Sequence, residues 1–132
     1  MNRIENWPTL LAEFIDSRRE LPFAWGERDC CLFAADAVEV ITGTDFAADY
    51  RSTYDSALSA HRVIAAAGGV PALVPFDEVE PSYAQRGDVV LLEQDGRDCL
   101  GIHLGHVIAG QGPDGLTFLP PNNAVRAWRT TA

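Results

Sequence analysis

The stretch DCCLFAADAVEVITG, residues 29–43, decides how this chain folds. Asp29 is a residue type that caps helix N-termini, and Gly43 is the type that most easily takes the left-handed conformation where a helix ends. Between them, apolar residues recur at alternating intervals of three and one, at Cys30, Phe33, Ala34, Ala37, Val38 and Ile41. This spacing predicts a helix over residues 30–42, with Cys30 at the N-terminal end of its buried face.

Two further helices are predicted, one on each side of this stretch. Residues 8–19 begin with Pro8, whose missing N–H costs nothing in the first turn of a helix, and they carry apolar residues at helical spacing. A third helix is predicted over residues 56–67, before the Gly68-Gly69 pair. Three prolines between residues 70 and 81 favour an irregular connection after it.

The second half of the chain predicts an antiparallel sheet. The predicted strands cover residues 88–93, 98–104, 116–119 and 125–129. The first two flank Asp95-Gly96, the signal of a tight type I′ hairpin, and a glycine-rich turn is predicted at residues 110–115. Helices followed by a β-meander indicate a single α+β domain over residues 1–132, with its helices packed on one face of the sheet.

Composition narrows the class of protein. The 132 residues are 47% hydrophobic and 22% charged, which fits one globular domain. Acidic residues outnumber basic ones by 19 to 10, and the basic residues are all scattered arginines, so neither nucleic acid nor an anionic membrane surface is an expected partner. No apolar run is long enough to span a bilayer and the N-terminus has no apolar signal region, so we expect synthesis in the cytoplasm without membrane insertion.

The cysteines supply the candidate chemistry. A cysteine in the first turn of a helix faces unpaired N–H groups and the positive end of the helix dipole, which favour the thiolate. Cys30 is therefore a candidate nucleophile, although the charge of Asp29 opposes the thiolate and a nucleophile also needs a base within hydrogen-bond reach. The alternative is that Cys30 is a small apolar residue of the core. Metal binding by Cys30, Cys31, Cys99 and His103 is not expected, because the metal-binding spacings CxxC and HxxxH are absent.

A series of short motifs resembles the NlpC-type superfamily of papain-like cell-wall cysteine peptidases. The motifs are FAWG (23–26), DCCLF (29–33), RGDVVLL (86–92) and LGIHLG (100–105). In that superfamily an Asp-Cys pair at a helix start carries the nucleophile, and a His-Val-Gly-Ile strand supplies the general base. The resemblance implies a papain-like α+β fold without cofactor or metal, in which Cys30 is the nucleophile and Asp29 the acidic residue before it. Together with Gly115-Leu116 and Ala127-Trp-Arg129, the series looks most like small phage and prophage tail-module proteins.

The chain departs from the family at the base position. The motif aligned with His-Val-Gly-Ile is CLGI, beginning at Cys99, so a thiol stands where the family has an imidazole. A neutral thiol is a poor base near neutral pH. His103 lies four residues further along the same strand face, about 13 Å away, and becomes the base only if the strand register slips. His61 and His106 are expected to be surface or partly buried side chains.

The resemblance implies two alternative functions. The first is a cysteine peptidase or amidase that cuts the peptide stems of peptidoglycan, with Cys30, Asp29 and His103 as candidate catalytic residues. The second is a catalytically degenerate component of a phage tail tip or baseplate, held in the virion tail by other tail proteins, which the thiol at Cys99 favours. Papain-like geometry also places Cys30 opposite Cys99, so that the two could form a disulfide in an oxidising setting. A third alternative, an intracellular thiol protein of another fold, is supported only by the presence of the cysteines.

Overall fold

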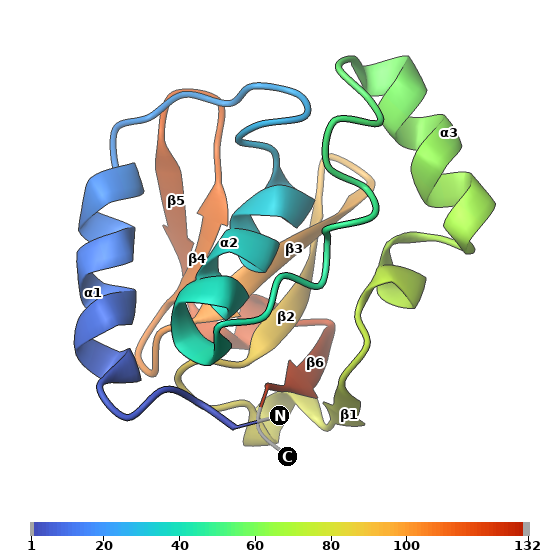
Figure 1. Ribbon diagram of the computed structural model, residues 1–132. Coiled ribbons are helices and arrows are strands. Elements are labelled where there is room, and N and C mark those ends of the chain that lie inside the picture. Colours follow the sequence, from blue (N-terminus) through green and yellow to red (C-terminus); the bar gives the residue numbers. More distant parts are fainter. Residues whose placement is uncertain (1, 131–132) are drawn as a thin grey trace.

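A computed structural model describes residues 2–130 as three α-helices and a six-stranded antiparallel sheet (Figure 1). The helices are α1 (Trp7–Arg18), α2 (Cys30–Thr42) and α3 (Ala57–Ala67). The strands are β1 (Asp77–Val79), β2 (Val89–Gln94), β3 (Arg97–His103), β4 (Ile108–Gln111), β5 (Leu116–Leu119) and β6 (Arg126–Arg129). The predicted α+β class is confirmed, and the three predicted helices are present within one residue of their expected ends.

Helix α2 begins and ends where its capping residues predict. The backbone N–H of Leu32 donates to Asp29 Oδ1 at 3.0 Å. At the other end Gly43 adopts φ 80° and donates its N–H to the carbonyl of Glu39 at 2.7 Å. The buried surface of the helix is wider than the predicted stripe, because α1, the sheet and the segment after α2 all pack against it. The side chains buried on α2 are Cys31, Leu32, Phe33, Ala34, Ala35, Ala37, Val38 and Ile41.

The sheet has the strand order β1-β6-β2-β3-β4-β5. Strands β2 to β5 form a meander in which β2, β3 and β5 were predicted, and the turn between β2 and β3 has positive φ at Asp95 and Gly96, as a type I′ hairpin requires. The last strand does not continue the meander. Strand β6 crosses back to pair with β2 on one side and β1 on the other.

Two of the six strands were not predicted. Strand β1 lies inside the segment expected to be irregular, and β4 overlaps the expected turn at residues 110–115. Both are short, and β4 has the sequence IAGQ, which lacks the alternation of apolar and polar residues by which a half-buried strand is recognised. Pairing to neighbouring strands stabilises these segments, so their own composition carries little signal.

Both faces of the central strands are buried. On the helix side, Leu91, Leu100 and Ile102 belong to the main core together with α1 and α2. On the opposite side, Val90 and Leu92 pack with residues of β4 and β6. This explains why residues 89–92 form a continuous apolar run rather than an alternating one.

Gly101 sits in β3 where there is no room for a side chain. A Cβ added there would lie 2.7 Å from the carbonyl oxygen of Ala109 on the neighbouring strand and 3.2 Å from side-chain atoms of Ile108 and Leu92. We expect Gly101→Ala to lower the free energy of unfolding by about 1–3 kcal/mol, because β3 and β4 must move apart. Urea unfolding measures this change.

Gly110→Ala is the matched control for that substitution. It lies on the adjacent strand, its φ is not positive, and an added Cβ would meet Leu92 at an ordinary contact distance of 3.6 Å. The prediction fails if the two glycine variants unfold at the same urea concentration.

The Gly87-Asp88 motif joins both ends of the described chain to the start of β2. Asp88 is fully buried and accepts from Arg3 at 2.9 Å, from Arg129 at 3.2 Å and from the backbone N–H of Gln85 at 2.9 Å. Gly87 adopts φ 95°, and a Cβ there would lie 3.1 Å from the Arg3 side chain. The motif therefore serves as a structural latch, which we call the Asp88 latch.

Candidate active site

Asp29 organises the start of α2. Its carboxylate is only 2% exposed, and besides Leu32 it accepts from the backbone N–H of Gly26 at 3.0 Å and the hydroxyl of Tyr54 at 2.6 Å. Gly26 adopts φ 80°, and an added Cβ would collide with the backbone carbonyl of Tyr54. Asp29 thus holds the loop before α2 and the segment after it against the first turn of the helix.

The Tyr54 hydroxyl is the buried partner of this carboxylate. Burial and the charge of Asp29 raise the pKa of Tyr54, so the phenol remains a hydrogen-bond donor at all ordinary pH values. We expect Tyr54→Phe to lower the free energy of unfolding by about 1.5–3 kcal/mol, the usual range for a hydrogen bond to a charged group. Thermal or urea unfolding of the purified variant measures the loss.

Tyr50→Phe is the control, because Tyr50 lines the same side of α2 and no hydrogen bond of its hydroxyl is seen among the described residues. Equal losses of stability in the two variants would show that Tyr54 contributes only its ring to the core.

The three cysteines meet at the first turn of α2. Cys30 and Cys31 are the first two residues of α2, and the pKa of Cys30 is affected by the Cys99 thiol and the Leu100 N–H of β3. Cys31 is buried, whereas Cys30 and Cys99 are partly exposed and none of the three forms a disulfide. We call this group the thiol cluster.

The three cysteines of the thiol cluster differ in the direction of their pKa shifts. Hydrogen bonds from Cys31, Cys99 and the Leu100 N–H hold the pKa of the Cys30 thiol well below its usual range, against the opposing effect of burial. The contact with Cys30, together with burial, raises the pKa of both Cys31 and Cys99. The site therefore favours the thiolate form at Cys30 over the thiolate forms of Cys31 and Cys99, as expected for a sulfur at a helix N-terminus.

The structure does not bring His103 to Cys30. The strands keep the unslipped register, with Leu92 opposite Cys99 and Val89 opposite Ile102. The ring of His103 is 5% exposed, and its Nδ1 accepts the N–H of Gly105 at 3.0 Å. Burial lowers the pKa of His103, and the charge of Asp88 partly opposes this effect.

The other two histidines, His61 and His106, are exposed. Of the three candidate catalytic residues, the structure thus brings Cys30 and Asp29 together and leaves His103 near the Asp88 latch at the other end of β3.

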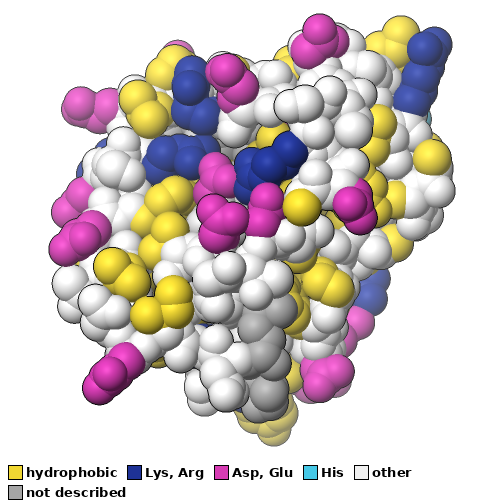
Figure 2. Space-filling view, viewed as in Figure 1, with side chains coloured by type: hydrophobic (Ala, Val, Ile, Leu, Met, Phe, Trp, Pro, Cys, Tyr) yellow, Lys and Arg dark blue, Asp and Glu magenta, His cyan; other side chains and the backbone are white. Residues whose placement is uncertain are grey.

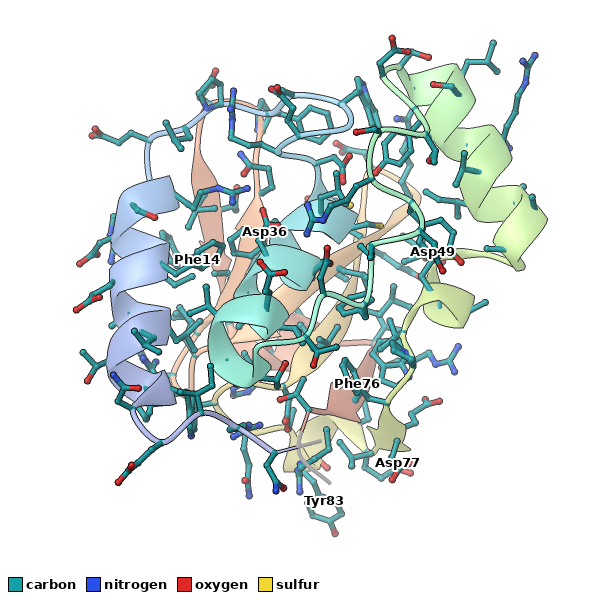
Figure 3. The ribbon with its side chains drawn as sticks, viewed as in Figure 1. Phe14, Asp36, Asp49, Phe76, Asp77 and Tyr83 are labelled. Carbon is teal, nitrogen blue, oxygen red and sulfur yellow. The ribbon has the colours of Figure 1, made fainter. Side chains whose placement is uncertain are left out.

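Sequence reasoning missed Asp36, which lies on α2 between α1 and the segment after α2 (Figure 3). It pairs with Arg18 of α1 at 2.8 Å and with Arg51 at 2.6 Å, and Arg51 also binds Asp45 at 2.7 Å. From its spacing, an acidic residue on the far side of the apolar stripe is expected to be solvated, and no local signal in the sequence connects Asp36 with Arg18 or Arg51. The pairs fix the 45–54 segment over α2, beside the thiol cluster.

A family model described as "Domain of unknown function (DUF6950)" matches residues 2–130, which is nearly the whole chain. The chain belongs to the DUF6950 family. No curated protein matches the sequence. Among solved structures, the DUF6950 domain is similar to one described as "Crystal structure of NlpC/p60 domain of peptidoglycan hydrolase SagA". That match has a TM-score of 0.58 and 14% identity, and it covers 92% of this chain and 97% of the other.

This likeness shows that the DUF6950 domain has the NlpC/p60 fold, as its motifs predicted. At 14% identity it speaks for the fold alone, so the chemistry of the DUF6950 site rests on the residues described above.

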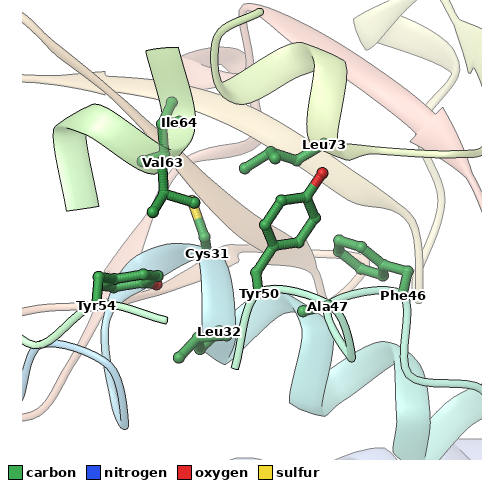
Figure 4. Close-up of a pocket in the computed structure, with 9 residues that line it drawn as sticks. All are labelled: Cys31, Leu32, Phe46, Ala47, Tyr50, Tyr54, Val63, Ile64 and Leu73. Carbon is green, nitrogen blue, oxygen red and sulfur yellow. The ribbon is translucent and has the colours of Figure 1, made fainter. Parts of the chain in front are cut away.

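An apolar pocket adjoins the thiol cluster of the DUF6950 domain (Figure 4). Cys31 and Leu32 of α2 form one wall, and Val63 of α3 and Leu73 form another. Tyr50 and Tyr54 contribute aromatic rings, so the lining is almost entirely apolar. An apolar surface therefore lies next to the thiol cluster on the side of α3.

The charged side chains on the surface of the DUF6950 domain do not form a basic area. On the face seen in Figure 2, acidic and basic side chains are interspersed and no continuous basic area forms. Among residues 2–130, no helix has both the length and the apolar composition needed to cross a membrane. Within the same residues, no three His, Cys, Asp or Glu side chains are grouped so as to hold a metal ion.

Proposed function

We propose that this protein is a tail-tip or baseplate component of a phage or prophage whose NlpC-type domain cleaves peptide bonds of peptidoglycan through Cys30. The observation that carries the proposal is the position of Cys30 in the first turn of α2, directly after the capping residue Asp29, where its pKa lies below the usual range. A preformed thiolate attacks a carbonyl without a base to remove its proton, which is the step for which the family's histidine is otherwise required.

The backbone at the start of α2 supplies the oxyanion site in this proposal. The N–H groups of Leu32 and Phe33 donate to Asp29, whereas no acceptor is seen among the described residues for the N–H of Cys30. Such an N–H, at the positive end of the helix dipole, stabilises the oxygen of a tetrahedral intermediate.

Cys99 takes part in the proton balance. Cys30 sulfur bonds to the substrate carbonyl carbon, the peptide C–N bond breaks, and the departing amine takes a proton from the neutral thiol of Cys99. Water then hydrolyses the thioester, releases the carboxylate and restores the proton to the site. A thiol is a weaker acid–base catalyst than an imidazole, so we expect slow turnover and an acyl-enzyme that lives long enough to be trapped.

The test is a digest of purified peptidoglycan with the reduced protein, with released fragments identified by mass spectrometry. The matched control is Cys30→Ala, which keeps the helix and removes the sulfur. We expect fragments and a Cys30 acyl adduct with the unaltered protein and neither with the variant. Fragments that also form with Cys30→Ala would refute the role of Cys30.

A second candidate function is a catalytically degenerate tail component, and the observation that favours it is the absence of an imidazole among the groups around Cys30 in residues 2–130. It is distinguished by the same digest. Folded protein that yields no fragments and no adduct from several types of wall, but is found by mass spectrometry in purified phage particles, would establish the structural role. Absence from purified particles would refute the tail assignment itself.

A further inference from the structure

Gly87 and Asp88 form a β-bulge opposite His103. The N–H of Gly87 donates to the carbonyl of His103 at 2.8 Å, and the N–H of His103 donates to the carbonyl of Asp88 at 2.9 Å. Two residues of one strand thus oppose a single residue of the next, and Gly87 has the positive φ that the first residue of this kind of bulge adopts. The Asp88 latch and the backbone of His103 are therefore parts of one hydrogen-bonded unit.

The ring of His103 is neutral in this unit, and its tautomer is fixed by one hydrogen bond. Its Nδ1 accepts the backbone N–H of Gly105 at 3.0 Å. A backbone N–H can only donate, so Nδ1 carries the lone pair and Nε2 carries the proton. The residue is 5% exposed, so an added proton would bring a charge into a poorly solvated position.

We propose that His103 makes the Asp88 latch sensitive to acid. In mildly acidic solution Nδ1 takes a proton from the solvent, and its new N–H points at the N–H of Gly105, so two donors face each other and their hydrogen bond is lost. The turn after β3 then separates from the bulge, and the latch that joins Arg3 and Arg129 to β2 weakens. The proposal concerns the fold and holds whether or not the domain cleaves peptidoglycan.

The groups packed around His103 do not offset the added charge. Asp88 is the acidic group whose charge acts on His103, and its carboxylate already accepts from the side chains of Arg3 and Arg129. A third positive charge beside one carboxylate leaves an excess of positive charge in a buried place. From β4, the residue paired with His103 is the apolar Ile108.

The turn after β3 adds no compensating negative charge. Arg86 donates from Nη1 to the carbonyl of Leu104 at 2.8 Å, so it holds the turn against the segment before β2 and brings another positive charge there. His106, at the far side of the turn, is exposed. Protonation of His103 is therefore opposed by burial and by the arginines of the latch.

The direction of the effect on stability follows from this environment. Burial lowers the pKa of His103 in the folded chain, and the charge of Asp88 only partly opposes this. The unfolded chain therefore binds the proton first, near the ordinary histidine pKa of about 6.5. The stability that neutral His103 contributes is fully present above that pH. It is lost as the pH falls from there to below the pKa of the folded chain.

The matched variant is His103→Asn, because Oδ1 of asparagine can replace Nδ1 as the acceptor for Gly105 and does not titrate. Urea unfolding of both proteins at pH 7.5 and pH 5.5 measures the effect. Between these pH values, the unfolding equilibrium constant of the unaltered protein should rise about five- to tenfold more than that of the variant. His106→Asn is the control and should behave like the unaltered protein. The same dependence on pH in His103→Asn as in the unaltered protein would overturn the proposal.

Hydrogen exchange shows whether the latch takes part. The N–H of Ile4, next to Arg3, donates to the carbonyl of Ile41 at 2.7 Å, so its exchange reports on the N-terminal segment. At pH 5.5 this amide should exchange about five- to tenfold faster in the unaltered protein than in His103→Asn, and at pH 7.5 the two rates should agree. Comparison at a single pH cancels the chemical dependence of exchange on pH. Equal rates at pH 5.5 would overturn the link between His103 and the latch.

An NMR titration of the unaltered protein answers the question even if the variant does not fold. The ring of His103 should titrate below about pH 6.5, the ordinary value for histidine, and the amide resonance of Gly105 should move with it. A ring that titrates at the ordinary value, or a Gly105 amide that does not respond, would overturn the proposal.

Discussion

Asp88→Ala lowers the free energy of unfolding by about 3–5 kcal/mol, the expected result of removing one member of a buried ion pair. Asp88 is fully buried, and its side chain is the acceptor for Arg3 and Arg129, whose side chains are 12% and 30% exposed. Without the carboxylate, the positive charge of Arg3 stays in a poorly solvated position beside the backbone of β2. The loss is a large share of the stability of a domain of this size.

Urea unfolding followed by tryptophan fluorescence measures this effect, because Trp7 and Trp128 lie in or against the main core near the latch. Glu78→Ala is the matched control: it also removes a carboxylate paired with an arginine, Arg126, but both side chains are largely exposed at 46% and 42%. We expect the control to unfold close to the unaltered protein. If the two variants unfold at the same urea concentration, the buried ion pairs of Asp88 contribute no more to stability than the exposed pair of Glu78.

Iodoacetamide modifies Cys30 about 10 to 100 times faster than Cys31 or Cys99 at pH 6. A cysteine of ordinary pKa is almost entirely protonated at this pH, whereas the lowered pKa of Cys30 gives it a larger fraction of thiolate, which is the reacting form. The lower intrinsic nucleophilicity of an acidic thiolate reduces this advantage without cancelling it. As pH rises, the Cys30 rate should level off at a lower pH than the rates of the other two cysteines.

Time-resolved peptide mapping measures the three rates in one sample. Cys99→Ala provides the sharpest comparison, because it removes one of the donors that stabilise the Cys30 thiolate. The pKa of Cys30 should then rise, and its rate at pH 6 should fall while its rate at pH 9 changes little. A Cys30 rate that increases with pH in parallel with Cys31 would show an ordinary core thiol.

Local signals determined how much of this fold could be predicted. Helix α2 has a capping residue, a helical apolar spacing and a terminal glycine, and all three indicate the same boundaries. Strands β1 and β4 have no such local signals, because their stability comes from neighbours that are far away in the sequence.

The candidate site was predictable only in part for a related reason. The position of Cys30 at a helix start follows from residues next to it in the chain, and that position is what made it a candidate nucleophile. Its contact with Cys99 depends on how α2 meets β3, and here only the resemblance to a known family pointed to it. The role of Asp88 depends on Arg3 and Arg129, from the two ends of the chain, which spacing cannot connect.

The position of β6 inside the sheet also sets the order in which the chain can fold as it is made. Proteins emerge from the ribosome N-terminal end first, and β6 is the last strand of the described chain to emerge. Until it does, β1 has no partner and β2 has one unpaired edge, because β6 lies between them. The sheet therefore cannot be completed until β6 has emerged. Until then, the edge of β2 that later pairs with β6 is the place where a chaperone or a neighbouring nascent chain would bind.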